Sequence, residues 1–209
     1  TSKENLNGKT VLITGGNCGI GYETAKDLLQ RSIFISLTNI FQTKKQMFIY
    51  IVDARVIIAC RNLTKGQKAI EKLVEETHCN ENQIVLMECD LSSLNSIRNF
   101  ANLYLKQEER LDILICNAGL GYSSTQTTED GFDYVIQSNY LGHFLLTNLL
   151  LEKLKQSKPS RILNISSDLH QSLLFSSLRF DHENNHKDVQ VLNQLIGQII
   201  DTTTKIQVD

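Results

Sequence analysis

The sequence predicts a three-layer α/β/α domain built on a doubly wound parallel sheet. Short, continuous apolar segments alternate along the chain with helical patterns of ten or more residues, as in parallel sheets covered on both faces. The first apolar segment, 10–14, ends in a glycine cluster, and a helical pattern follows directly. At 209 residues the chain can build one such domain with a substantial core. We expect this domain at 1–180 and a divergent tail at 181–209.

The predicted elements follow one another in regular order. Continuous apolar segments predict strands at 10–14, 55–60, 83–88, 111–116 and 161–167. Apolar residues at helical spacing predict helices at 19–31, 65–76 and 94–106, and a long one that follows the polar loop 123–131 and ends near Lys155. Ser92 or Ser93 is suited to cap the helix at 94–106. The sheet is expected to stop after its fifth strand.

Two stretches depart from this pattern. Residues 32–53 insert two apolar pieces around a polar centre where about 2–6 residues usually suffice. A hairpin, an interfacial segment and a buried excursion all remain open for this insertion. In the tail, the apolar face of 189–200 predicts one short helix, and 202–209 is expected to be frayed.

Composition excludes several classes of function. A net charge of −2 and a pI near 6.2 give no electrostatic reason to expect a nucleic-acid or anionic-membrane partner. Five cysteines without a C-x-x-C pair suit reduced thiols, and Cys60, Cys89 and Cys116 are expected in the core because each lies in or beside an apolar segment. No apolar run reaches the roughly 18 residues of a membrane span, and the first eight residues are polar. We therefore expect an intracellular protein.

The carboxyl ends of the predicted strands carry polar residues or glycine. Ligands bind at this edge of a doubly wound sheet, and glycines before a helix N-terminus suit a dinucleotide phosphate. At the end of the second strand an acidic residue would bind the ribose 2′-hydroxyl of NAD, whereas an arginine accommodates the 2′-phosphate of NADP. This chain has Arg61 there, so NADP is expected in preference to NAD.

Five motifs in register give the chain a resemblance to a known family. They are Thr14-Gly15 with Gly19-Ile20-Gly21, Asp90-Leu91, Asn117-Ala118-Gly119, the segment 138–144 around Asn139, and 161–167. Together they resemble the short-chain dehydrogenase/reductase family, whose sheet is of the Rossmann type. The wording of 55–66 and 159–170 is similar to the branch that contains retinol dehydrogenases and the WW-domain oxidoreductase.

The resemblance implies a role for each matching residue. The catalytic group would include Asn139, which organises a proton-relay water, and Ser167, which hydrogen-bonds the substrate. The reaction would be hydride transfer between the nicotinamide and a small lipophilic alcohol or carbonyl. The cofactor-binding residues would be Gly15, Asn17, Gly19, Ile20, Gly21, Arg61, Asn62, Asp90, Leu91, Asn117, Ala118 and Gly119.

The acid/base pair of the family has no match in these 209 residues. The family protonates the alkoxide with a tyrosine four residues before a lysine, and no Tyr-x-x-x-Lys follows Ser167. We therefore expect a catalytically incomplete oxidoreductase. The H-E-x-x-H at 182–186 is read as a polar loop, not as a zinc site, because two asparagines make a poor helix interior.

Two alternatives stay open at this level. One is a non-catalytic module that binds a dinucleotide or a protein, with an open edge at the fifth strand that favours homo-oligomers. The other is a damaged fragment, in which 32–53 and the tail are misjoined coding segments. The family's membrane-tethered members leave two locations open, the cytoplasm and the cytosolic face of the endoplasmic reticulum.

Overall fold

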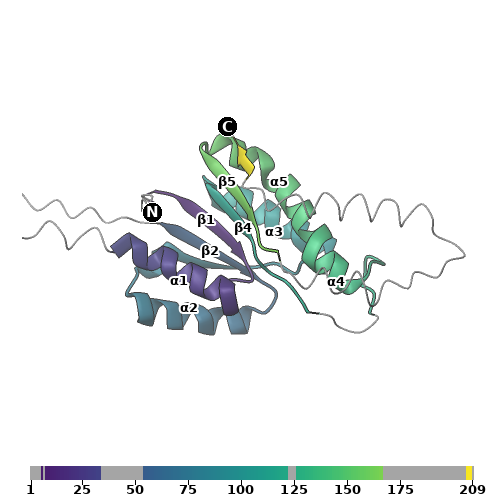
Figure 1. The fold of residues 1–209 in the computed structure, drawn as a ribbon, viewed down its shortest axis with the longest axis horizontal. Coiled ribbons are helices and arrows are strands. Elements are labelled where there is room, and N and C mark those ends of the chain that lie inside the picture. Colours follow the sequence, from purple (N-terminus) through teal and green to yellow (C-terminus); the bar gives the residue numbers. More distant parts are fainter. Residues whose placement is uncertain (1–5, 7, 34–53, 122–125, 167–205, 209) are drawn as a thin grey trace, which may run out of the picture.

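One twisted sheet forms the centre of the molecule (Figure 1). The structure is a computed structural model that describes residues 6, 8–33, 54–121, 126–166 and 206–208. Within these residues the sheet has six strands in the order β3-β2-β1-β4-β5-β6. The first five strands pair in parallel and β6 pairs antiparallel with β5. The strands are β1 (Thr10–Thr14), β2 (Arg55–Cys60), β3 (Ile84–Glu88), β4 (Ile113–Cys116), β5 (Ser160–Asn164) and β6 (Ile206–Val208).

Helices cover both faces of the sheet, so the predicted three-layer α/β fold is confirmed (Figure 1). On one face lie α1 (Gly19–Ile33) and α2 (Leu63–Thr77). On the other face, α3 (Leu94–Gln107) packs against α5 (Gly142–Gln156). The shorter elements are the 3₁₀ helix η2 (Glu81–Gln83), α4 (Tyr134–Ile136) and the π-helical η3 (Gln137–Leu141), which joins α4 to α5.

The core is divided between the two faces by the alternation of β1. Leu12 packs into the cluster under α3 and α5, whereas Val11 and Ile13 pack into the cluster under α1 and α2. All five residues of β1 are buried, as expected for a central parallel strand. Cys60, Cys89 and Cys116 are also buried, which confirms their interpretation as core thiols, and Cys79 is buried as well.

The structure corrects the sequence at the edge of the sheet. Residues Ile206–Val208 are paired with β5 over Ser160–Ile162, so the prediction of a wholly frayed C-terminus is wrong. The β5 edge is not open along these residues, which removes the argument for homo-oligomers through it. Of the insertion predicted at 32–53, the first two residues belong to α1. Its remainder at 34–53, the predicted helix at 189–200 and the segment 182–186 lie outside the described residues.

Where the structure describes the chain, none of its helices combines the length and the apolar character that a membrane crossing demands.

Candidate dinucleotide site

The turn between β1 and α1 is shaped by three glycines. Gly15 and Gly19 have φ values of +67° and +56°, a region that side chains with a Cβ rarely adopt. At Gly21 a Cβ would fall on the side-chain amide of Asn117 and 2.5 Å from the Gly15 carbonyl oxygen. Nothing lies within 4 Å of a Cβ built on Gly19, so space is open beside the first turn of α1. A pyrophosphate fits such a turn, because the N–H groups at a helix N-terminus favour an anion.

Ile20 lies in this turn as a large, strongly exposed apolar residue. Its side chain is 68% exposed, unlike the buried apolar residues of β1 on which the turn rests. Apolar exposure beside the open space at Gly19 suits a residue that a bound cofactor would cover. Asn17 is half-buried in the same turn.

The hydroxyl of Thr14 ties the ends of β1 and β4 together. Its Oγ1 accepts hydrogen bonds from the backbone N–H groups of Asn117 and Ala118, each at 3.0 Å. Asn117 returns a bond, since its side-chain amide donates to the Thr14 carbonyl at 3.0 Å. Ala118 also packs against Gly15, where an added Cβ would lie 3.0 Å from the Ala118 Cα. The predicted Asn117-Ala118-Gly119 motif therefore supports the glycine turn directly.

His143 extends this network from Thr14 to Asn139. Its Nδ1 lies 2.9 Å from the carbonyl oxygen of Asn139, which can only accept, so Nδ1 carries a proton. Its Nε2 lies 2.8 Å from Thr14 Oγ1. Burial lowers the pKa of His143, against the opposing effect of the Asn139 bond. A neutral His143 thus accepts at Nε2 a hydrogen bond from the Thr14 hydroxyl.

The side chain of Asn139 is fixed on the loop that follows β4. Its Oδ1 accepts from the Leu120 N–H at 2.8 Å, and its Nδ2 donates to the Leu120 carbonyl at 3.0 Å. Gly119 lies beside it, since a Cβ on this glycine would be 3.9 Å from Asn139 Oδ1. The second predicted catalytic residue, Ser167, lies outside the described residues.

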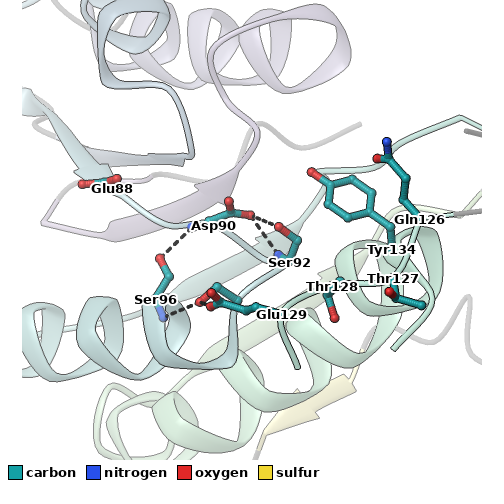
Figure 2. A pocket seen from close by; sticks show the side chains of 10 residues that line it. Glu88, Asp90, Ser92, Ser96, Gln126, Thr127, Thr128, Glu129 and Tyr134 are labelled. Atoms are coloured by element: carbon teal, nitrogen blue, oxygen red, sulfur yellow. Dashed lines mark hydrogen bonds between the residues drawn. The ribbon is translucent and has the colours of Figure 1, made fainter. Parts of the chain in front are cut away.

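A pocket of about 720 Å³ lies at the carboxyl end of β3 (Figure 2). Glu88 and Asp90 line one side, and the segment 126–129 with Tyr134 lines the other. The carboxylate of Asp90 is held in place by Ser92, whose N–H and hydroxyl donate to Oδ1 at 2.9 and 2.6 Å. Leu91, the next residue, is buried. The volume and the fixed carboxylate suit the adenine end of a dinucleotide.

The residues after β2 have different surroundings. Arg61 is exposed and its Nη1 donates a hydrogen bond to the Tyr134 hydroxyl. Asn62 is the N-cap of α2, with Oδ1 accepting from the Lys65 N–H at 2.8 Å. Its side-chain oxygen therefore has a structural role, in addition to the cofactor contact that the sequence predicts.

Sequence reasoning missed the parts that connect these residues. His143 and Tyr134 were assigned no role, and Gly142 was not singled out. A Cβ on Gly142 would lie 2.6 Å from the Leu91 carbonyl oxygen, so this glycine lets the start of α5 pass close to the Asp90-Leu91 turn. His143 lies four residues after Asn139, one helical turn away, and this spacing is the signal from which their contact could have been predicted.

The glycine turn and the strand order define an α/β protein of the Rossmann type, a fold whose sheet binds ligands at the carboxyl ends of its strands. A family model described as short chain dehydrogenase matches residues 49–175. Retinol dehydrogenase 11 from Homo sapiens is 45% identical over 170 residues, a match that covers 81% of this chain and 46% of that protein. Retinol dehydrogenase 14 from Mus musculus is 39% identical over 191 residues, with 87% of this chain and 50% of that protein covered.

Solved structures agree with this assignment. An uncharacterised protein from Mycobacterium paratuberculosis has a TM-score of 0.60 and 32% identity, covering 84% of this chain and 55% of its own. The RhlG/NADP active-site complex of Pseudomonas aeruginosa has a TM-score of 0.57 and 28% identity, covering 78% and 56%. The chain belongs to the short-chain dehydrogenase family, and its relatives belong to the retinol dehydrogenase-like branch, so both predictions are confirmed. It spans about half the length of the curated relatives it matches.

Proposed function

We propose that this chain binds NADP(H) in preference to NAD(H), as part of an oxidoreductase that acts on a small lipophilic alcohol or carbonyl. The observation that carries the proposal is Arg61, which directly follows β2 at the same edge of the sheet as the glycine turn. At this position a carboxylate would repel the 2′-phosphate of NADP, whereas a guanidinium attracts it. The relatives called retinol dehydrogenases support the lipophilic substrate class.

Each part of the site has an assigned partner on the cofactor. The N-terminus of α1 and the turn from Gly15 to Gly21 would hold the pyrophosphate. Asp90 would accept from the adenine amine, and the 117–119 segment would support the ribose. The cofactor supplies the hydride acceptor or donor. Asn139 and Ser167 are proposed to orient a water and the substrate oxygen.

We further propose that the 209 residues bind the cofactor without turning it over at ordinary enzyme rates. No Tyr-x-x-x-Lys follows Ser167 in the printed sequence, so no phenol of the family's kind is available to protonate the alkoxide. A binding module without catalysis is therefore the second candidate function. We place either form in the cytoplasm or on the cytosolic face of the endoplasmic reticulum.

Fluorescence titration with NADPH and NADH tests the cofactor proposal. We expect saturable NADPH binding that is tighter than NADH binding, and a reversal toward NADH in Arg61→Asp. Equal preference before and after this substitution would refute the role of Arg61. The matched assay for turnover follows NADPH absorbance with retinal as substrate. Steady consumption of NADPH would disprove the proposal that the chain binds the cofactor without turning it over. If neither dinucleotide binds while far-UV and near-UV circular dichroism report a packed fold, the dinucleotide function itself is wrong.

A further inference from the structure

The arginine assigned to the 2′-phosphate is held by a residue that is distant in sequence. Arg61 and Tyr134 are separated by 73 positions, and the Arg61 Nη1 donates to the Tyr134 hydroxyl. Arg61 is exposed, and a free arginine side chain in water samples many rotamers. A fixed acceptor at its end restricts that freedom and so sets where the guanidinium points.

Tyr134 is itself well fixed at its backbone. Its N–H donates to the Gln126 carbonyl at 3.0 Å, and it is the first residue of α4. Asp133 caps this helix, because its Oδ1 accepts hydrogen bonds from the N–H groups of Val135 and Ile136, both at 2.9 Å. The Tyr134 ring thus starts from a rigid point at the wall of the pocket (Figure 2).

The loop that carries Tyr134 is anchored on the N-terminus of α3. The Leu94 N–H donates to Asp130 Oδ2 at 2.9 Å, and the Gln137 side-chain amide donates to the same oxygen at 2.6 Å. The hydroxyl of Ser93 donates to the carboxylate of Glu129. These bonds fix the loop against the same β3–α3 turn that carries Asp90.

Carboxylates on the opposite side of the pocket would compete for Arg61. Glu88 pairs in register with Cys60, the residue before Arg61, and Asp90 follows two positions later. An arginine released from Tyr134 would be attracted to these anions, where it could not meet a phosphate. The Tyr134 hydroxyl is uncharged, so it holds the guanidinium without neutralising it. After accepting from Arg61, it still has its own proton to donate.

We propose that Tyr134 is the positioning residue for the 2′-phosphate of NADP(H). It holds the Arg61 guanidinium beside the β3 pocket, and its hydroxyl donates a hydrogen bond to a phosphate oxygen. Tyr134 therefore sets the ratio of NADP(H) to NAD(H) affinity, through a contact that NAD(H) cannot make. This inference rests on the proposed function, since it concerns the same cofactor site.

A double-mutant cycle with Tyr134→Phe and Arg61→Gln tests the proposal on the full 209-residue chain. The probes are NADPH and NADH, together with 2′,5′-ADP and 5′-AMP, which carry the adenosine end with and without the 2′-phosphate. We expect Tyr134→Phe to weaken NADPH and 2′,5′-ADP about ten- to a hundredfold, the value of one hydrogen bond to a charged group, and to leave NADH and 5′-AMP unchanged. In the Arg61→Gln background the same substitution should cost less, because only the direct bond to the phosphate is then lost and no guanidinium remains to be positioned.

Tyr140→Phe is the matched control, because it also removes one phenol hydroxyl and lies outside the pocket lining. It should leave all four affinities unchanged. Equal weakening of NADPH and NADH by Tyr134→Phe would mean a merely structural role and overturn the proposal. Unchanged or tighter NADPH binding would also overturn it, since the hydroxyl would then be idle or in competition with the phosphate. If the unmodified chain binds neither dinucleotide, the proposed function is wrong. If only the Tyr134 proposal is wrong, the unmodified chain still prefers NADPH to NADH.

Discussion

Replacement of Thr14 by valine should destabilise the protein far more than its conservative shape suggests. Valine keeps the β-branched outline that suits β1 but has no hydroxyl. The Thr14 hydroxyl accepts from the N–H groups of Asn117 and Ala118 and pairs with His143 Nε2. Three lost hydrogen bonds at about 1 kcal/mol each give a loss of about 3 kcal/mol in the free energy of unfolding.

Thr14→Ser is the control, since it keeps the hydroxyl and removes one buried methyl at a cost of about 1 kcal/mol. Urea unfolding followed by circular dichroism measures both variants. With a slope of about 2 kcal/mol per molar, the midpoint should fall by about 1.5 M for Thr14→Val and about 0.5 M for Thr14→Ser. A larger loss in Thr14→Ser than in Thr14→Val would show that packing of the methyl, and not the hydroxyl, holds the two strand ends together.

Three further predictions concern the same frame. Gly21→Ala should lower the free energy of unfolding by about 2 kcal/mol and weaken NADPH binding roughly tenfold, because the added Cβ meets the Asn117 amide. Gly121→Ala is the control, since nothing lies within 4 Å of its added Cβ, and it should change neither value. Urea unfolding and NADPH titration measure the two effects. Burial alone would raise the pKa of Asp112, but hydrogen bonds from two cationic side chains outweigh it and hold the pKa below its usual value. Asp112→Asn should therefore cost about 2–3 kcal/mol at pH 7, and the difference from the unmodified chain should shrink as the pH falls below about 4, as urea unfolding at both pH values would reveal. Burial lowers the pKa of His143, so stability should fall as the pH drops below its unfolded value of about 6.5, because the unfolded chain then binds more protons; this slope should be weaker in His143→Gln, and an unchanged slope would rule out His143 as its source.

The sequence was sufficient for the central strands and for the glycine turn. The bounds of β1 and β2 match the predicted 10–14 and 55–60 because both strands are buried on both faces and consist of continuous apolar segments. The turn was visible because two positions with positive φ and one close approach to Asn117 each require glycine. At these positions the backbone conformation or the lack of space permits only glycine, so the sequence alone reveals the structure.

The rest depends on contacts that no local pattern contains. The expected long helix is divided by the π-helical Gln137–Leu141, which has the same side-chain types as an α-helix and shifts only the backbone bonds. The pairing of Ile206–Val208 with β5 involves three residues, too few for a periodic signal. The bond between Arg61 and Tyr134 joins two elements across 73 positions, and only the fold brings them together.

The hydrogen-bond chain through His143 links the glycine turn to Asn139 and requires a particular protonation state of His143. The Thr14 oxygen already accepts hydrogen bonds from two N–H groups, so its own hydroxyl hydrogen can point only in the one direction that remains. His143 Nε2 offers an acceptor at 2.8 Å, whereas the Ile115 carbonyl is 3.4 Å away. A protonated His143 would point a third donor at the same oxygen and leave the hydroxyl only the longer bond. Burial lowers the pKa of His143 and so preserves the neutral form, which keeps the glycine turn and Asn139 in one connected frame.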